Sequence, residues 1–541
     1  MYINFSYLPN NSKLFLDYLY RFSNLKAFYP YNFRDREFYP LIFNQNRKTD
    51  SIHRERVYDI IKNQYQDNNP SQKTQNNIEL LKKPNTLAVV TGQQVGLFGG
   101  PLYTLYKTIT TIKLCNLLSE EFDSYNFVPV FWMETEDHDL EEVSQLITLD
   151  NEGNIKELHL FEKEITDENR KPVGEIKFGE EIKNFIEQYQ NLLRGTDFSS
   201  AIFSSIHEYY SPGSTFADAF RKLIFSLFDK YGLIIFNPAD RDAKKLLQPL
   251  FLKEIQDFRK HSEALVNISA SLDDIYHAQV KVKPVNLFMY NEGNRHAVEP
   301  TEEGFRLKNK RIKLTKEELT NLVENSPELF SPNVLLRPVC QDFIFPTAFY
   351  VAGPAEVAYF AQSLVLYDFF KISRPVIFPR ASVTLIEKNI NSLITKYKVG
   401  IEEVFSLKDK LPDKMISNLA GSNIEDIFTE SRAGLDKIFL KLKSECAEVD
   451  PQLSDMSEKY KQKVFSVVNE FQAKTNEAHK RKYDIVIKQS QKLVNNLFPV
   501  SVMQERVFNY TLFANKYGQE MLELLFNEIK VTKFEHQIIN L

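Results

Sequence analysis

The chain of 541 residues has little cysteine, no long apolar run and no excess of positive charge. Its three cysteines, Cys115, Cys340 and Cys446, stand far apart and form no CxxC pair, which excludes a zinc-ribbon or disulfide framework and suits a reducing cytosol. No apolar run approaches the ~20 residues needed to cross a bilayer. The first residues lack a basic region followed by an apolar core, so we expect no signal peptide, no membrane partner and a cytoplasmic protein. The formal net charge of -5 provides no basic field for nucleic acid.

The composition is otherwise that of an ordinary globular protein. Hydrophobic residues make up 43% of the chain and charged residues 26%, and the length allows two or three domains with a large core. Residues 1–85 are aromatic and mixed in charge, and we expect them to form helices and loops that precede the first core strand.

The stretch 87–101 organises the chain. Its apolar beginning predicts a short buried strand, four glycines predict a loop, and Pro101 opens a helical run. Such a strand–turn–helix suits an anion or nucleotide, because glycines allow close backbone approach and helix N–H groups favour negative charge. It is neither a P-loop nor a GxGxxG fingerprint, and the alternative is a tight turn whose glycines serve only packing. The candidate binding residues are Thr91, Gly92, Gln93, Gln94, Gly96, Gly99 and Gly100.

A second predicted strand, 127–133, contains the only tryptophan, Trp132, and runs into the cluster Glu136, Asp137, His138 and Asp139. Strand, helix and strand fit a βαβ unit, which places both polar segments at neighbouring ends of parallel strands. Three carboxylates around one imidazole could hold a divalent metal, orient a base or bind an ammonium group. The alternative is an acidic helix N-terminus. Because no second histidine lies nearby in the sequence, no dedicated metal site is predicted.

Further apolar runs end in polar residues that could converge on the same pocket. Residues 232–240 resemble another core strand, followed by a helix from about Asp242 to His261. Arg337 stands among strand-like apolar residues and could grip a carboxylate or phosphate, or form a buried ion pair. The candidates from these later runs are Arg337, Gln341, Asp342, Gly353, Glu356, Arg380 and Ser382.

The domain organisation follows from shifts in composition. We expect a core over 1–386, interrupted by insertions at about 150–230 and 262–330, the first with a charged hairpin-like region from His159 to Lys177. Residues 387–498 are rich in Lys, Glu, Asn and Gln, and a break near Asp450 predicts an antiparallel coiled coil of two long helices. Its expected apolar positions are Ile424, Ile427, Leu435, Ile438, Leu442, Val449, Val464, Val468, Phe471, Ala478 and Ile485.

The C-terminal segment, 499–541, is expected to return to the core. Polar residues in this segment could form a second ligand site beside the coil, although structural hydrogen bonding explains them equally well. They are Arg506, Asn509, Tyr517 and Gly518.

Taken together, these motifs resemble the family of bacillithiol-biosynthesis cysteine-adding enzymes, BshC. The resemblance rests on Thr-Gly-Gln-Gln-x-Gly-Leu-x-x-Gly-Pro at 91–101, Trp-x-x-x-Glu-Asp-His-Asp at 132–139, Arg-Pro-x-x-Gln-Asp at 337–342, Gly-Pro-x-Glu at 353–356 and Pro-Arg-x-Ser at 379–382. The coiled coil and Arg-Val-Phe-Asn at 506–509 also match, so the likeness covers about residue 85 to the C-terminus. One departure is Ala355, where the family pattern has glycine, and it narrows this loop slightly.

The resemblance implies an α/β fold with a Rossmann-like core of the nucleotidyltransferase and class I aminoacyl-tRNA synthetase type. It also implies two connecting-peptide insertions, a coiled-coil domain and a homodimer. The implied activity joins L-cysteine to the amine of glucosaminyl malate in the last step of bacillithiol synthesis. A nucleotide site near the coiled coil, apart from the Rossmann pocket, is implied as well, which leaves the role of ATP open.

The chemistry of such a reaction sets its own requirement. A free carboxylate does not acylate an amine at neutral pH and must first become a phosphate or adenylate ester, so we expect ATP as a Mg-nucleotide. As a hypothesis, N–H groups of 91–101 hold phosphate or carboxylate, and Arg337 or Arg380 binds malate carboxylates or developing phosphate charge. In the same hypothesis, Asp137, His138 and Asp139 either position the ammonium group of cysteine or remove a proton from the sugar amine. Together with Gln93 these three form the predicted catalytic set. The alternatives are a nucleotidyltransferase acting on another small substrate and a non-catalytic coiled-coil scaffold.

Overall fold

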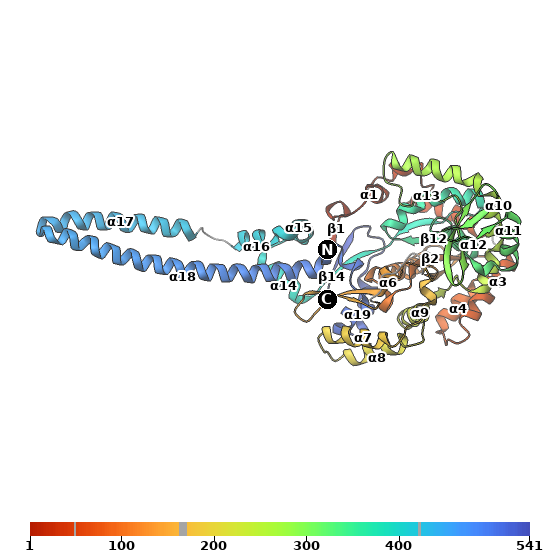
Figure 1. Cartoon of the computed structure of the whole chain (residues 1–541), viewed down its shortest axis with the longest axis horizontal. Coiled ribbons are helices and arrows are strands. Elements are labelled where there is room, and N and C mark those ends of the chain that lie inside the picture. The colour runs from red at the N-terminus through yellow and green to blue at the C-terminus, as the bar shows by residue number, and fades with distance from the viewer. Residues whose placement is uncertain (48–49, 162–169, 420–423) are drawn as a thin grey trace. The chain divides into compact units, whose positions relative to one another are not determined.

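The computed structural model describes residues 1–47, 50–161, 170–419 and 424–541 (Figure 1). These residues form two compact units. The first comprises Met1–Leu385 and Val502–Ile539, and the second comprises Ile386–Ser501 and Asn540–Leu541. The expected hairpin-like region from His159 to Lys177 lies partly outside the described residues. Within the described ranges, no helix is both long and apolar enough to cross a membrane.

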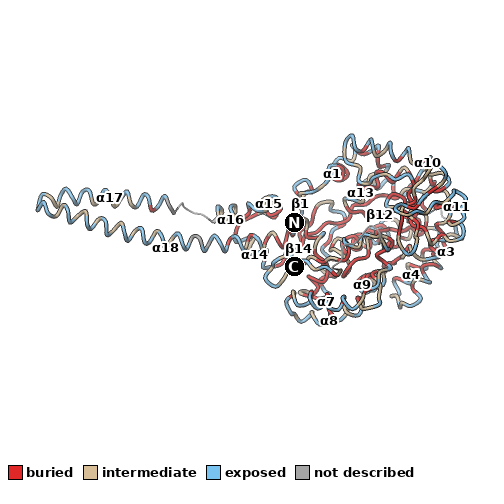
Figure 2. The backbone as a smooth tube through the Cα atoms, in the orientation of Figure 1, coloured by how far each residue is buried: buried red, intermediate tan, exposed pale blue. Residues whose placement is uncertain are grey.

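A five-stranded parallel sheet forms the core of the first unit, in the order β13-β12-β2-β3-β6. Its strands read as nearly continuous apolar runs, because a parallel sheet with both faces covered must bury both sets of side chains. This arrangement confirms the predicted α/β class with a Rossmann-like core, and Figure 2 shows these strands buried. The strands are β2 (Thr86–Gln94), β3 (Asn126–Glu134), β6 (Ile234–Phe236), β12 (Thr347–Ala352) and β13 (Val376–Pro379).

The end of β2 differs from the expectation. Gly92, Gln93 and Gln94 continue the strand and pair with the last three residues of β3, whereas the sequence predicted that they belong to a loop. Ladder hydrogen bonds to β3 outweigh the weak strand preference of glycine and glutamine at this point. The turn begins only at Val95 and leads through Gly99 and Gly100, both with positive φ, into α5 (Leu102–Glu121).

The helices that follow the strands include two departures from the sequence-based expectations. Arg337 starts α12 (Arg337–Ile344) and does not lie in a strand, because Asn333 caps the preceding turn and Pro338 fits a first helical turn. The helix after β6, α10 (Arg241–Asp273), continues well past His261, so the expected boundary at 262 lies inside it. After β12, α13 (Pro354–Phe370) begins at the Gly-Pro turn.

The remaining elements of the first unit surround this sheet. Those before β2 are β1 (Tyr2–Ile3), α1 (Lys13–Tyr20), α2 (Tyr39–Asn46), α3 (Ser51–Gln64) and α4 (Gln72–Leu80). Between β3 and β6 lie α6 (Leu140–Ser144), the hairpin β4 (Gln145–Leu149) and β5 (Ile155–His159), α7 (Glu181–Leu192), α8 (Ser199–Tyr209) and α9 (Phe216–Phe228). The C-terminal part adds α19 (Tyr510–Tyr517), α20 (Glu520–Glu528) and β15 (His536–Asn540), and β15 stands between β1 and β14 (Ser382–Ile386) in a small sheet.

A second, antiparallel sheet lies between α10 and α12 in the sequence. Its order is β10-β9-β8-β7-β11, and α11 (Lys316–Asn325) is inserted before its last strand. The strands are β7 (Leu287–Asn291), β8 (Asn294–Pro300), β9 (Phe305–Leu307), β10 (Lys313–Leu314) and β11 (Phe330–Pro332).

The second unit contains α14 (Lys388–Tyr397), α15 (Ile401–Leu407), α16 (Leu411–Leu419) and two long helices, α17 (Ile424–Val449) and α18 (Pro451–Leu497). Figure 1 shows α17 and α18 side by side in opposite directions, which confirms the predicted coiled coil. The break occurs where Asp450 caps α18 and Pro451 takes its first position.

The predicted seam of this coiled coil is only partly correct. Leu435, Val464 and Val468 are half-buried as expected, and Phe428 and Phe439, which the spacing missed, also turn inward. Because apolar residues occur on more than one face of α17 and α18, spacing alone could not select the seam. The side chain of Ile424 lies outside the described set. Phe471 is 64% exposed, yet its ring packs edge-on against Phe428 of the facing helix, with 5.7 Å between the ring centroids, as a seam position does. The other expected positions are exposed: Ile427, Ile438, Leu442, Val449, Ala478 and Ile485.

Candidate active site

A cavity of about 520 Å³ opens at the carboxyl edge of the parallel sheet. The ends of β2, β3 and β12 supply its floor, as open α/β sheets commonly do for ligands. Phe288 and Arg295 of the antiparallel sheet and Arg506 of the C-terminal segment complete its wall. Thus residues from the parallel sheet, the antiparallel sheet and the C-terminal segment meet at one polar site.

The glycine-rich turn does not face this cavity. The N–H of Gly99 donates to the hydroxyl of Tyr210 at 3.2 Å, and the N–H of Gly100 donates to the carbonyl of Leu97 at 3.0 Å. Leu102, at the start of α5, donates its N–H to the carbonyl of Phe508 at 2.8 Å. The N–H groups of Gly99 and Gly100 therefore have protein acceptors, so the hypothesis that N–H groups of 91–101 hold phosphate or carboxylate does not extend to these two. The part of the motif that lines the cavity is the strand end, 92–94.

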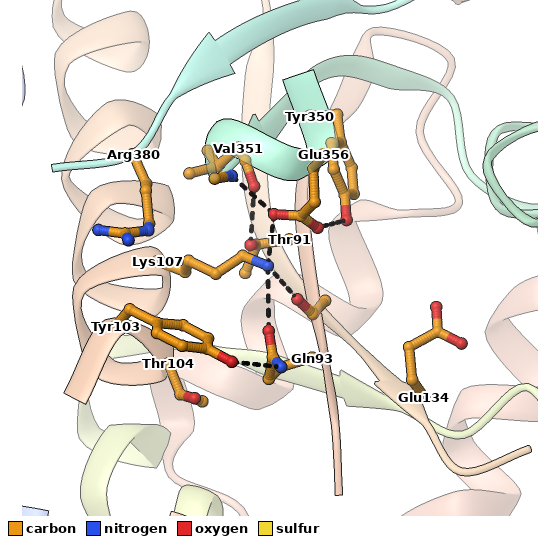
Figure 3. A network of polar contacts seen from close by, with 12 residues as sticks. Thr91, Gln93, Tyr103, Thr104, Lys107, Glu134, Tyr350, Val351, Glu356 and Arg380 are labelled. Atoms are coloured by element: carbon orange, nitrogen blue, oxygen red, sulfur yellow. Dashed lines mark hydrogen bonds and ion pairs between the residues drawn. The ribbon is translucent and has the colours of Figure 1, made fainter. Parts of the chain in front are cut away.

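Lys107 of α5 is the centre of the buried network drawn in Figure 3. Its ammonium group lies 2.7 Å from a carboxylate oxygen of Glu356 and donates to the carbonyl of Gly92 at 2.5 Å. Glu356 also accepts the N–H of Gly353 at 2.6 Å and the hydroxyl of Tyr350 at 2.6 Å. Although burial alone raises the pKa of Glu356, Lys107 and these donors hold it below its ordinary value. The pair ties α5, β2 and the start of α13 together.

Arg337 occupies the neighbouring position at the start of α12. It donates to Gln341 at 2.9 Å and to the hydroxyls of Tyr359 and Tyr350 at 3.0 and 3.3 Å, and its Nε lies 3.1 Å from Oε1 of Glu134. Asp342, which accepts from Gln341, is buried behind this cluster. Burial raises the pKa of Asp342 to about 6. The Arg337 side chain is therefore fixed by hydrogen bonds and already has a carboxylate partner, Glu134.

The residues of the acidic cluster after β3 make different contacts and serve different roles. Glu136 is buried, lies 2.5 Å from the ammonium of Lys244 on α10 and accepts the hydroxyl of Tyr290 at 2.8 Å. Asp137 accepts from the side chain of Gln94 and from the backbone N–H of His138 at 2.7 Å.

Asp139 caps α6 by accepting the N–H of Glu142 at 3.2 Å. The alternative interpretation, an acidic helix N-terminus, therefore applies to Asp139 and leaves Asp137 at the cavity.

His138 lies between two guanidinium groups. Arg295 approaches its Nδ1 at 3.4 Å and Arg170 its Nε2 at 3.3 Å. Burial, followed by the charge of Arg295, lowers the pKa of His138. A neutral imidazole accepts at one nitrogen only. Because both guanidinium groups are positive, the surroundings of His138 suit an anion better than an ammonium group.

The C-terminal segment reaches the cavity through a second buried ion pair. Arg380 donates to both carboxylate oxygens of Glu505, at 2.7 and 3.1 Å, and Ser382 donates to Glu505 at 2.9 Å. This anchor presents the neighbouring Arg506, whose guanidinium lies 5.9 Å from the ring centroid of Tyr103. Arg506 is exposed at the cavity wall.

The structure brings together twelve of the predicted site residues as cavity lining: Gly92, Gln93, Gln94, Trp132, Glu136, Asp137, His138, Arg337, Gly353, Glu356, Arg380 and Arg506. The others occupy supporting positions. Thr91 donates to the carbonyl of Val351 on the neighbouring strand, Asn509 caps α19, and Tyr517 and Gly518 end that helix. Gly96, Gly99 and Gly100 form the turn, and Asp139, Gln341, Asp342 and Ser382 hold their neighbours as described.

Sequence reasoning missed several lining residues, above all Tyr103, Lys107, Glu134 and Arg295. Lys107 stands in a helix, where a lysine normally indicates a solvated face. Glu134 is adjacent to the acidic cluster, and its position at the end of an apolar strand could have identified it as a site residue. Among the described residues, no group of three or more His, Cys, Asp and Glu side chains is arranged to hold a metal ion.

Comparison with known proteins gives consistent matches over the whole chain. Residues 1–381 match the family model "Bacillithiol biosynthesis BshC, N-terminal Rossmann-like domain", and residues 383–541 match "Bacillithiol biosynthesis BshC, C-terminal coiled-coil domain". A Salinibacter ruber protein named "Putative cysteine ligase BshC" is 35% identical over 97% of this chain and 96% of its own length. Proteins of the same name from Chloroherpeton thalassium and Koribacter versatilis are 34% and 33% identical, over 86% and 98% of this chain and 85% and 98% of theirs.

Proposed function

We propose that this chain is a ligase that joins the carboxyl group of L-cysteine to the amine of glucosaminyl malate. The chain belongs to the BshC family of bacillithiol biosynthesis. The observation that carries the proposal is the cavity at the carboxyl edge of the sheet, in which carboxylates and cations converge. Lys281, Lys283 and Arg506 line it, are exposed and form no ion pair within the part of the chain that the structure describes. They offer charge for the malate carboxylates.

The same three cations support a nucleotide as co-substrate. An amide cannot form from a free carboxylate at neutral pH, and ATP supplies the activated acyl group. Because Arg337 and Arg380 are already held by neighbouring side chains, Glu134 and Glu505 among them, we assign phosphate binding to the unpaired cations in their place. A cavity of about 520 Å³ falls within the usual range of small-molecule sites. The bond formed is a carbon–nitrogen bond.

Two further features belong to the proposal. The exposed apolar residues of α17 and α18 support a homodimer formed by a second copy of this chain. The use of a thiol substrate, together with two buried free cysteines, supports action in the cytoplasm.

The test is mass spectrometry of product from purified protein, glucosaminyl malate, L-cysteine and Mg-ATP, with each component omitted in turn. The expected result is a cysteinyl amide that disappears without ATP, and the nucleotide product identifies the activated intermediate. Asp137→Asn and His138→Ala should abolish the amide and leave the fold intact, because Asp137 and His138 line the cavity and are partly exposed. Full product formation by both variants would contradict the assigned site.

Two other results would favour a different function. Exchange of pyrophosphate into ATP that needs neither L-cysteine nor glucosaminyl malate would indicate a nucleotidyltransferase acting on another substrate. Absence of any product, with partner binding that is lost when the coiled coil is disrupted, would indicate a scaffold.

A further inference from the structure

Glu134 is the last residue of β3, and its side chain reaches the cavity directly from the carboxyl edge of the sheet. It pairs in register with Gln94 of β2, so the two side chains leave the same face of neighbouring strands. The Glu134 side chain is 23% exposed, which places it within reach of a ligand without full hydration. None of the motifs described above includes it.

Of the other four carboxylates that line the cavity, three are already engaged, and the fourth, Glu142, accepts from Gln94 at 3.3 Å. Glu356 faces Lys107 at 2.7 Å and Glu136 faces Lys244 at 2.5 Å, so both are held as charged partners of buried lysines. Asp137 accepts from a side chain and from two backbone N–H groups. A carboxylate with several such partners can contact a substrate amine only by giving up an existing contact.

Glu134 has a single charged partner at contact distance. Nε of Arg337 lies 3.1 Å from its Oε1, yet this buried oxygen accepts no hydrogen bond from the residues that the structure describes. In Figure 3 the Glu134 carboxylate lies apart from the contacts that join Glu356 to Lys107 and Tyr350. Arg337 is fixed by Gln341 and Tyr359, so it cannot turn to enclose the carboxylate.

Burial and the charges around Glu134 bring the pKa of its carboxyl group close to neutral pH. Burial is the largest effect, Arg337 of α12 and Arg295 of β8 oppose it, and the nearby Asp137 and Glu136 add to it. The result raises the pKa of Glu134 to about 7. A general base works best when its pKa is close to the operating pH. By contrast His138, the base named from sequence, has a guanidinium at each ring nitrogen and a lowered pKa.

We propose that the Glu134 carboxylate is the general base that removes a proton from the amine of glucosaminyl malate. The inference rests on the ligase function proposed above. Glu134 takes one proton from the ammonium form and thereby frees the nitrogen lone pair. The nitrogen then bonds to the activated cysteinyl carbon, and the bond from that carbon to the phosphate oxygen breaks with its electron pair on the oxygen. The second proton lost from the nitrogen passes to solvent.

The experiment compares two acceptors for the activated cysteinyl group. Hydroxylamine is unprotonated at neutral pH and needs no base, whereas the amino sugar does. With Glu134→Gln we expect amide formation at pH 7 to fall by about 10²- to 10⁴-fold, while ATP-dependent cysteinyl hydroxamate formation continues. Glu134→Asp should recover part of the amide rate.

The pH dependence supplies a second readout. Because the base must be deprotonated, the ratio of amide to hydroxamate should rise with pH through about 7 in the wild type. Glu134→Gln should lose this rise. The matched control is Glu141→Gln, on the exposed first turn of α6, for which both ratio and pH profile should stay unchanged.

The outcomes separate the inference from the proposed function. Absence of both hydroxamate and amide in the wild type would refute the ligase proposal itself. Normal amide formation by Glu134→Gln, or equal loss of both products, would overturn the role of Glu134 alone. Selective amide loss in Glu142→Gln instead would also overturn it, because Glu142 lines the same cavity with a pKa raised by burial.

Discussion

At the scale of single residues, three of the seven lysines and arginines that line the cavity form an ion pair with a carboxylate, and Lys244 of α10 forms a fourth such pair. An ion pair removed from water gains little net stability, but loss of one partner leaves an uncompensated buried charge. Each pair also joins elements that are distant in the sequence, so it fixes where the strand ends and loops stand. The pairs are Lys107 with Glu356, Lys244 with Glu136, Arg337 with Glu134, and Arg380 with Glu505.

Lys107→Met should destabilise the first unit by about 3–5 kcal/mol, because Glu356 would remain charged and buried. Urea unfolding followed by fluorescence measures this directly, since Trp132 is the only tryptophan and is buried beside the cavity. Glu356→Gln in the Lys107→Met background should restore part of the loss.

A matched control tests whether burial is the cause. Lys183 and Glu180 also lie 2.7 Å apart, but both are exposed, and exposed pairs contribute little. Lys183→Met should leave the unfolding midpoint almost unchanged. Equal effects of the Lys107 and Lys183 variants would show that the buried network does not support the fold.

At the scale of elements, the site depends on how far β2 extends alongside β3. Gly92 stands opposite Trp132, and a Cβ on Gly92 would lie 2.9 Å from the carbonyl oxygen of Trp132. Glycine is needed here for close approach of two backbones, and its carbonyl then accepts from Lys107. This role agrees with the alternative left open by the sequence, in which glycines of the stretch 87–101 serve packing, although Gly92 lies in a strand and also lines the cavity.

Gly92→Ala should therefore destabilise the first unit by about 1–3 kcal/mol through overpacking, and should lower amide formation as the strand end shifts. Gly96→Ala is the comparison for stability, because its Cβ would meet only Val143 at an ordinary 3.5 Å. Urea unfolding followed by Trp132 fluorescence serves for both variants. A larger loss for Gly96→Ala than for Gly92→Ala would contradict the packing argument.

At the scale of the whole molecule, the coiled coil carries exposed apolar side chains that its own seam does not use. Ile438 and Leu442, one turn apart on α17, are 56% and 45% exposed. Exposed apolar surface of this kind commonly marks an interface. A second copy of the chain is the partner that we propose for it.

The chain should sediment as a dimer, and Ile438→Lys with Leu442→Lys should yield monomers with unchanged helix content. Ile438 and Leu442 are 56% and 45% exposed, so a charge at either position stays hydrated and should leave the packing of α17 on α18 largely in place. Sedimentation velocity and circular dichroism measure the two properties. A monomeric wild type, or a doubly substituted dimer, would place the interface elsewhere or exclude it.

The amino-acid sequence by itself determined the α/β class, the βαβ unit around 87–133 and the two long helices on either side of Asp450. These features depend on local patterns, since apolar runs, helical periodicity and caps act over a few residues. It also predicted about half of the polar residues that line the cavity, because these follow an apolar strand or stand in a recognisable motif.

Only the tertiary structure decided which of those residues are ion-paired, which line the cavity and which hold their neighbours. Lys107 and Glu356 are far apart in the chain, and their pairing exists only because β2 and β12 are adjacent in the sheet. The proton affinity of Glu134 likewise depends on burial and on charges from α12 and β8, which no local pattern contains. Sequence specifies elements through short-range periodicity, whereas charge pairing and desolvation arise from contacts between distant segments.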